Sequence, residues 1–194
     1  SLIHMNENRL ISFLRNEIGV SEAAYFGANF AGNLQVQQIP EEYQQLLFFF
    51  KNTPIQSYLK LGVANGGSFF VNSIFMQNTA TTVHCVDCLA YKDAPHVKQT
   101  DIKILNKVNR LKTFFPQKEF KFFNSTTDDF FARNNLAYDC IFIDADHSYE
   151  GVMKDYKNSL NFVKKPGHLI FHDISNANTG VAQCWDEVSK NHKI

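Results

Sequence analysis

The feature that most constrains the fold is a regular alternation of short apolar segments with longer segments of helical spacing. Five apolar segments, each closed by turn residues, predict strands over 55–63, 81–87, 120–125, 138–145 and 167–174. Helices are predicted over 6–18, 40–51, 69–77, 101–115, 127–134, 151–163 and 180–190. Strands that alternate with helices form right-handed βαβ units. We therefore expect an α/β protein with a mainly parallel, doubly wound sheet, helices on both faces and a three-layer sandwich architecture.

Length and charge narrow the function classes. The chain has 194 residues, so we expect an N-terminal helical preface over 1–52 packed on one core domain over 53–194. Lys plus Arg and Asp plus Glu both number 19, which argues against a nucleic-acid partner and favours a small-molecule one. No apolar run approaches the roughly 20 residues of a membrane span, and the N-terminus lacks the apolar region of a signal peptide. We expect no membrane partner and a cytoplasmic location.

The four cysteines predict neither a disulfide framework nor a zinc site. Cys85 and Cys88 have the CxxC spacing of a zinc or redox pair, but Cys140 and Cys184 lie far apart and supply no second pair. We expect all four to be reduced and structural.

Polar residues gather where the predicted strands end. In an open parallel sheet, ligands bind beyond the carboxyl ends of the strands, where the strand order reverses. These ends carry Gly62 to Ser68, Asp87, Asn124 with Ser125, Asp144 to His147, and His172 with Asp173. The candidate site is therefore expected at this edge of the sheet.

The turn after the first strand and the acid after the second favour a nucleoside ligand. Gly62, Gly66 and Gly67 stand between a strand and a helix, where glycine lets a ligand approach the backbone; an ordinary tight turn is the alternative. Asp87 follows Gly62 by 25 residues, the position of an acid that binds ribose hydroxyls or, alternatively, caps the next segment. Ala64 stands where a dinucleotide fingerprint has its second glycine, so a ligand without a pyrophosphate fits better.

Four segments carry a family resemblance. They are "YLKLGVANGGS", "VHCVD", "YDCIFIDADHSYEGVMKDY" and "GHLIFHDI", and in this order and spacing they resemble class I S-adenosylmethionine-dependent methyltransferases. More narrowly, they are similar to a bacterial subgroup with an "IDxDHSYEGV" block. That subgroup is related to the metal-dependent sugar O-methyltransferases of macrolide biosynthesis and, more distantly, to catechol O-methyltransferase. The resemblance covers about 38–190 and implies a Rossmann-like domain that binds S-adenosylmethionine.

The resemblance also implies roles for single residues. The residues implied around the cofactor are Gly62, Ala64, Gly66 and Ser68 at the methionine part, Asp87 at the ribose, Ser125 or its neighbour at the adenine, and Asp144. The residues implied to hold Mg²⁺ are Asp144 and Asp173, with His172 in the place of a further ligand. His147 falls at the position of a catalytic histidine.

The sequence departs from the family pattern in two places. The family has an acid two residues before the first glycine, and this chain has Lys60 there. Lys60 either reaches the carboxylate of the methionine part or pairs with Asp144, and the second arrangement competes with metal binding. The chain also stops at Ile194, before the last two strands of the family fold, so either it is cut short or the sheet has five strands.

The predicted function is S-adenosylmethionine-dependent O-methylation of a small molecule or sugar hydroxyl. A divalent cation on Asp144 and Asp173 would lower the hydroxyl's pKa, and His147, whose ordinary pKa lies near neutrality, would be the base. The alternative readings are that Asp144 caps a helix, that His147 binds a backbone carbonyl, and that His172 is a core residue. An NAD(P)-dependent oxidoreductase and a non-catalytic module that binds a nucleoside cofactor are the rival functions. The oligomeric state stays open, with the N-terminal helices as a candidate dimer interface.

Overall fold

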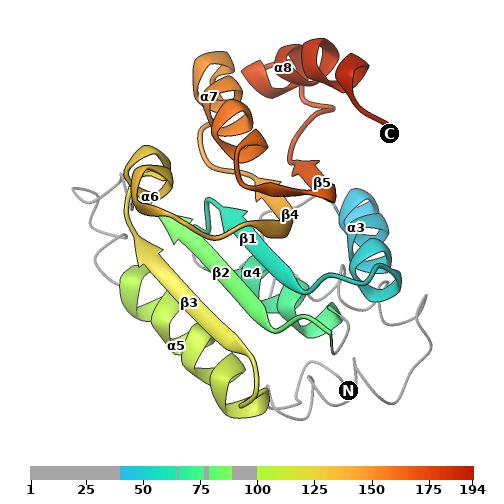
Figure 1. Cartoon of the computed structure of the whole chain (residues 1–194). Helices are drawn as coiled ribbons and strands as arrows, with labels where there is room; N and C mark the ends of the chain where they lie inside the picture. Colours follow the sequence, from blue (N-terminus) through green and yellow to red (C-terminus); the bar gives the residue numbers. More distant parts are fainter. Residues whose placement is uncertain (1–39, 65, 77–78, 89–99) are drawn as a thin grey trace. The chain divides into compact units, whose positions relative to one another are not determined.

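The computed structural model describes residues 40–64, 66–76, 79–88 and 100–194. Over these residues helices and strands alternate along the chain, as the sequence predicts (Figure 1). The predicted helix over 6–18 lies outside the described residues. The predicted boundary between residues 52 and 53 stays a prediction.

The described elements follow one another in a single α/β series. They are α3 (Pro40–Asn52), β1 (Ser57–Leu61), α4 (Gly67–Phe75), β2 (Thr82–Asp87), α5 (Thr100–Phe114), β3 (Glu119–Asn124), α6 (Thr127–Arg133), β4 (Tyr138–Ile143), α7 (Tyr149–Leu160), β5 (Val163–Phe171), α8 (Gly180–Val188) and a 3-10 turn, Ser189–Asn191. The chain divides into two compact units: α3, α4 and α5 belong to the first, and β1, β4, β5 and α6 to α8 belong to the second. Strands β2 and β3 begin in the first unit and end in the second.

In the first unit, helices α3 and α4 are joined by apolar packing and one buried hydrogen bond. The side chains of Tyr43, Leu47 and Phe50, spaced to lie on one face of α3, are buried. The Tyr43 hydroxyl donates to Oδ1 of Asn72 in α4 at 2.6 Å. Helix α4 is buried along its whole length, including its three polar residues, Ser68, Asn72 and Ser73.

The five strands of the described residues form one sheet in the order β3-β2-β1-β4-β5, with β1 parallel to β4 and β4 parallel to β5. After β1 the chain adds β2 and β3 on one side, and it then returns to place β4 on the other side of β1. The strand order therefore reverses between β1 and β4, which is the position where doubly wound sheets bind ligands. The fold is a Rossmann-like α/β fold.

Strand β5 differs from its predicted range. We predicted that a helix would end at Val163 and that Pro166 and Gly167 would form a turn before the strand. In the structure α7 ends at Leu160 and β5 begins at Val163. Tyr138 of β4 pairs with Val163 of β5, whereas Cys140 of β4 pairs with His168 of β5. Residues 164–167 of β5 therefore form a bulge between these two pairs. The bulge is polar and exposed, which explains why the apolar pattern failed to mark it.

The core of the second unit surrounds β4. Leu59, Leu61, Ile141 and Ile143 of the two central strands are all at most 2% exposed. Their neighbours in the same cluster come from β2 and from α6, α7 and α8. All four cysteines are free, as predicted. Among the described helices, none is long and apolar enough to cross a membrane.

Candidate active site at the ends of β1 and β4

Backbone hydrogen bonds align the carboxyl ends of the strands in the second unit. The N–H of Asp144 donates to the carbonyl of Leu61 at 2.9 Å, directly after the last paired residues of β1 and β4. The N–H of Gly62 donates to Val86 in β2 at 2.8 Å, and that of His172 donates to Ile143 at 3.2 Å. The polar residues that follow β1, β2, β4 and β5 are thereby brought to one edge.

Gly62 allows the turn after β1 to lie against the end of β4. Its φ is +85°, and a Cβ built there would lie 2.0 Å from the carbonyl oxygen of Asp144. Only glycine fits both this backbone conformation and this contact. Ala64 follows with a φ of +49°.

Asp87 holds the same turn from the end of β2. Its Oδ2 accepts hydrogen bonds from the backbone N–H groups of Val63 at 2.8 Å and Ala64 at 3.1 Å. The sequence predicts that Asp87 contacts a ribose or caps the next segment. The structure adds a third role, in which its carboxylate binds the turn after β1. Residues 89–99, after Asp87, lie outside the described part of the chain, so the capping alternative is not described.

The remaining cofactor residues implied by the resemblance lie in two places. Gly66, at φ +87°, is the N-terminal cap of α4, and Ser68 is buried in its first turn; both belong to the first unit. Ser125 lies in the second unit directly after β3, where its N–H donates to the carbonyl of Asp87 at 3.1 Å.

Lys60 is buried in the middle of the site. Its side chain is 1% exposed, and Nζ donates to Oδ2 of Asp144 at 2.8 Å and to the carbonyl of Gly62 at 2.7 Å. The ring of Phe142 lies below the ammonium, with its centroid 4.8 Å from Nζ. Of the two arrangements that the sequence left open for Lys60, the structure contains the pair with Asp144.

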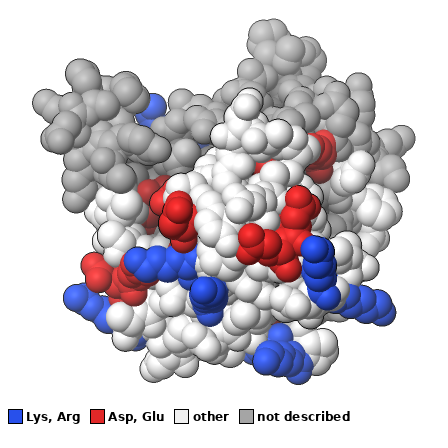
Figure 2. Space-filling view, turned by 90° about the horizontal axis from the view of Figure 1, so that it is seen from above, with Lys and Arg blue, Asp and Glu red and all other residues white. Residues whose placement is uncertain are grey.

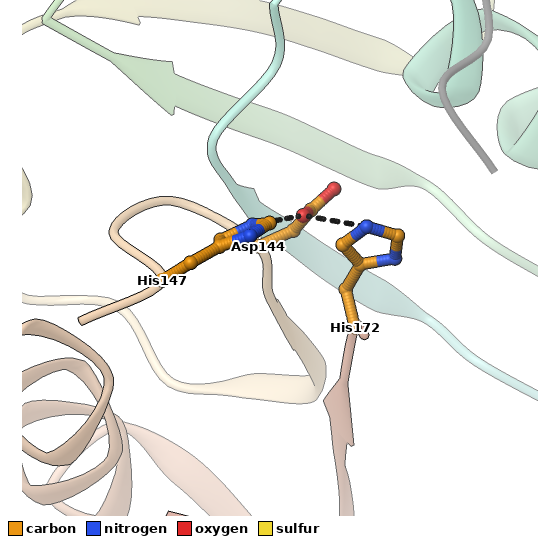
Figure 3. A group of neighbouring side chains, drawn as sticks. All are labelled: Asp144, His147 and His172. Atoms are coloured by element: carbon orange, nitrogen blue, oxygen red, sulfur yellow. Dashed lines mark hydrogen bonds and ion pairs between the residues drawn. The ribbon is translucent and has the colours of Figure 1, made fainter. Parts of the chain in front are cut away.

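Two histidines approach the other oxygen of the same carboxylate (Figure 3). Nε2 of His147 lies 3.3 Å from Oδ1 of Asp144, and Nε2 of His172 lies 3.6 Å from it. Nδ1 of His147 lies 3.6 Å from Oδ2 of Asp173. Asp144 is therefore the centre of the cluster, with an ammonium on one oxygen and two imidazoles near the other.

The loop after β4 fixes the backbone of His147. The next residue, Ser148, caps α7 by accepting from the N–H of Gly151 at 3.0 Å, and its own N–H donates to Oδ1 of Asp146 at 2.8 Å. The carbonyl of His147 accepts from the N–H of Gly180 at 2.9 Å, at the start of α8. Asp146 thus shapes the turn, whereas His147 is held by its main chain with its side chain 37% exposed.

The environment moves the pKa values of the three central groups in different directions. Burial raises the pKa of Asp144, but the charge of Lys60 and the hydrogen bond from His147 outweigh it, so this pKa is lowered overall. The hydrogen bond to Asp144 raises the pKa of His147, against a smaller opposing effect of burial. Burial lowers the pKa of His172 despite the nearby carboxylates. These directions favour an ionised Asp144 and a neutral His172, and they favour the protonated form of His147 more than in a free imidazole.

The cluster does not fit Mg²⁺. Asp144, His147 and His172 each offer one ligand atom, and these atoms lie within 4.8 Å of one another. Mg²⁺ prefers oxygen ligands in octahedral geometry, and this set has two nitrogens and one carboxylate. The carboxylate is already paired with the ammonium of Lys60. Asp173, an implied ligand, approaches His147 instead of completing the group.

A cavity of about 430 Å³ in the second unit was not predicted. It is lined by residues of β2, β3 and β4 and by α6 with the loop that follows it, and Ser125 is among them. Nδ1 of His84 and the hydroxyl of Tyr138 lie 2.8 Å apart in its wall, both fully buried. Neither residue lies at the carboxyl end of a strand, where the sequence predicts the site, so the sequence pattern does not indicate them.

These features define a Rossmann-like domain with a cluster of one carboxylate, two histidines and a lysine at its point of strand reversal. Residues 59–174, more than half of the chain, match the model of a family described as a methyltransferase domain. The chain belongs to this family of methyltransferase domains.

Solved structures similar to the chain share its fold at low identity. An O-methyltransferase from Bacillus cereus in complex with SAH has a TM-score of 0.58 and 14% identity, over 94% of this chain and 84% of that one. The O-methyltransferase TomG from Streptomyces achromogenes, in complex with SAM, gives 0.55 and 10%, over 96% and 88%. SAH-bound PaMTH1 from Podospora anserina gives 0.58 and 12%, over 98% and 88%. No curated protein matches the sequence significantly.

Proposed function

We propose that the protein is an S-adenosylmethionine-dependent methyltransferase that methylates a hydroxyl of a small molecule or sugar, with His147 as the base. The observation that carries the proposal is the imidazole of His147, accessible to solvent and held by Asp144 at the strand reversal of a methyltransferase domain. The similar structures support the cofactor and the oxygen acceptor, because they include O-methyltransferases in complex with SAM or SAH.

The base requires a histidine with one nitrogen fixed and the other available. Asp144 approaches Nε2 of His147 at 3.3 Å, which favours the tautomer with its proton on Nε2. Nδ1 lies 3.6 Å from Asp173, too far for a hydrogen bond. We assign Nδ1 as the atom that takes the proton of the acceptor hydroxyl. Bound S-adenosylmethionine would supply the methyl group: a C–O bond to the acceptor would form as the C–S bond of the sulfonium breaks and S-adenosylhomocysteine leaves.

Lys60 does not bring an uncompensated positive charge to this chemistry. A free ammonium would repel the positively charged sulfur of the cofactor. In the structure the ammonium of Lys60 is neutralised by Asp144 at 2.8 Å and bound to the Gly62 carbonyl at 2.7 Å. The pair is close to neutral as a whole, so Lys60 is compatible with cofactor binding. It also keeps Asp144 ionised, which is the state that orients His147.

The turn after β1 and the acid after β2 are the proposed contacts of the cofactor within the second unit. Gly62 and Ala64, both at positive φ, present main chain at the end of β1. Asp87 is the proposed ribose contact, and Ser125 the proposed adenine contact. Gly66 and Ser68 remain sequence-based assignments. Mg²⁺ is not part of the proposed mechanism, because the cluster does not suit it.

A small acceptor suits the charge distribution. On the face drawn in Figure 2, the described acidic and basic side chains are interspersed, without a continuous basic field. Elsewhere in the described residues, Lys154 pairs with Asp128. The described part of this face therefore offers no basic tract for a nucleic acid.

The proposal is tested by calorimetry and by turnover. S-Adenosylmethionine and S-adenosylhomocysteine should bind the purified protein, and NAD should not; binding of NAD alone would identify an oxidoreductase-type site instead. Turnover is then measured as S-adenosylhomocysteine released with a panel of phenols, sugars and hydroxy acids. His147→Gln should lower turnover by roughly 10²- to 10⁴-fold, the usual contribution of a general base, and leave S-adenosylhomocysteine binding unchanged.

His168→Gln is the matched control, because His168 is an exposed histidine of β5. It should keep both binding and turnover. Equal turnover in His147→Gln and the wild type would remove His147 as the base. Cofactor binding without turnover on any acceptor would favour the non-catalytic module.

A further inference from the structure

We infer that Lys60 is a built-in cation that takes the place of a divalent metal at Asp144, and that removing it would turn the cluster into a metal site. Its consequence for catalysis, that methyl transfer here needs no metal, rests on the proposed function. The metal-binding part stands on the geometry alone.

The position of the ammonium is fixed from three sides. Lys60 lies inside β1, where its Cα is paired with Phe142 of β4, and its side chain is 1% exposed. Nζ is bound by the Asp144 carboxylate and the Gly62 carbonyl, and it stands over the Phe142 ring. Leaving this position would break all of these contacts. A metal ion arriving at the cluster would therefore meet a buried positive charge that stays in place.

The ammonium already supplies the charge that a metal would supply. Lys60 balances Asp144, and His147, when protonated, balances Asp173. A divalent ion on Oδ1 of Asp144 would lie within a few ångströms of the ammonium and would be repelled by it. An ammonium has no lone pair, so Lys60 cannot become a ligand. The wild-type cluster is therefore expected to reject divalent ions.

Without Lys60, the same residues form a recognisable ligand set. The ligand atoms of Asp144, His147 and His172 lie within 4.8 Å of one another. Two imidazoles and one carboxylate suit transition metals better than Mg²⁺. An uncharged residue at position 60 would leave the Asp144 carboxylate without its ammonium partner. It would also remove the repulsion between that ammonium and a metal ion.

The test measures Co²⁺ binding to untagged protein by its visible absorption, which reports imidazole ligation, and by calorimetry. The wild type should show no saturable band. Lys60→Met should bind Co²⁺ about 100-fold more tightly, at the upper end of the effects that residues around a metal site have on affinity. Lys60→Arg, which keeps the charge, should behave as the wild type. Lys157→Met, on the exposed side of α7, should also gain nothing.

Three outcomes would overturn the inference. The first is a Co²⁺ band in the wild type that disappears in Asp144→Asn, a comparison that needs no Lys60 variant to fold. The second is a folded Lys60→Met, or the more polar Lys60→Gln, that gains no affinity. The third is wild-type turnover that stops in excess EDTA and returns with a divalent metal, which overturns the catalytic part. Absence of any methyl transfer would remove the proposed function and leave the Co²⁺ result standing.

Discussion

The close contact between Gly62 and the end of β4 gives a prediction that can be worked through in numbers. Gly62 and Gly66 have nearly the same backbone, with φ of +85° and +87°, so alanine at either one must adopt a left-handed conformation. That conformation costs an L-residue about 1–2 kcal/mol. The two glycines differ in what a Cβ would meet. Gly66→Ala is therefore the matched control for Gly62→Ala.

At Gly66 the nearest atom to a built Cβ is Cδ of the flexible Lys107 side chain, at 3.3 Å. At Gly62 the nearest atoms belong to the main chain of β4's end: the Asp144 oxygen at 2.0 Å and its carbonyl carbon at 2.5 Å. The end of β4 would have to move by about 1 Å, which weakens the 2.9 Å hydrogen bond from Asp144 to Leu61. Each lost hydrogen bond costs about 1 kcal/mol, and steric overpacking costs about 1–3 kcal/mol.

We expect Gly66→Ala to lower the free energy of unfolding by about 1 kcal/mol and Gly62→Ala by about 4 kcal/mol. Urea denaturation measures both, followed by circular dichroism and by the fluorescence of the single tryptophan, Trp185 of α8. The larger loss would be a substantial share of the ~5–15 kcal/mol that stabilises an ordinary domain. Equal losses of stability in the two variants would refute the steric clash with the end of β4. They would leave only the cost of the left-handed conformation, which both variants share.

Three further predictions concern titration and burial. Deprotonated His147 is the proposed base, and its pKa is raised above 6.5, so kcat/KM should fall on the acid side with a midpoint above pH 6.5. Asp144→Asn should move this midpoint to lower pH, because Asp144 is the main cause of the raised pKa. An unmoved midpoint would exclude Asp144 as the cause. Burial raises the pKa of Asp155 from 3.8 to about 6, so the stability it contributes is full below the unfolded value and is lost as pH rises through about 6. Asp155→Asn should therefore be about 3 kcal/mol more stable than the wild type near pH 8 and lose this advantage near pH 4, whereas a pH-independent difference would contradict the shift. Tyr138→Phe removes the buried hydrogen bond to His84 and should cost about 1–2 kcal/mol in urea denaturation; a neutral effect would show that the bond contributes little.

Apolar segments predicted the described strands well wherever pairing is regular. The predicted β1, β2, β3 and β4 each overlap the observed strand, because each strand is a short apolar run with turn residues beyond it. Strand β5 began earlier than predicted, since its first half is polar and exposed and is defined by the bulged pairing with β4. Such pairing depends on backbone register, which leaves no periodic signal in the sequence.

The candidate site was predictable in its location and less so in its contacts. Strand ends meet at one edge of a parallel sheet, so Asp144, His147 and His172 were expected together, and the structure brings them together. The partner of Lys60 depends on the direction in which its long side chain points, and the sequence does not determine that direction. The hydrogen bond between His84 and Tyr138 joins residues 54 positions apart, one inside β2 and one at the start of β4, where sequence patterns suggest apolar packing.

The contact of Gly62 with Asp144 also bears on how such a site changes during evolution. The turn proposed to receive the cofactor and the carboxylate proposed to orient the base are joined through main chain and through Lys60, so a change in one is transmitted to the other. His172 approaches Asp144, and Asp173 approaches His147, each at 3.6 Å, which is longer than the hydrogen bonds that Lys60 makes. Substitutions after β5 should therefore disturb the joined pair less than substitutions at Gly62 or Lys60, so variation in acceptor preference is more readily accommodated on the β5 side.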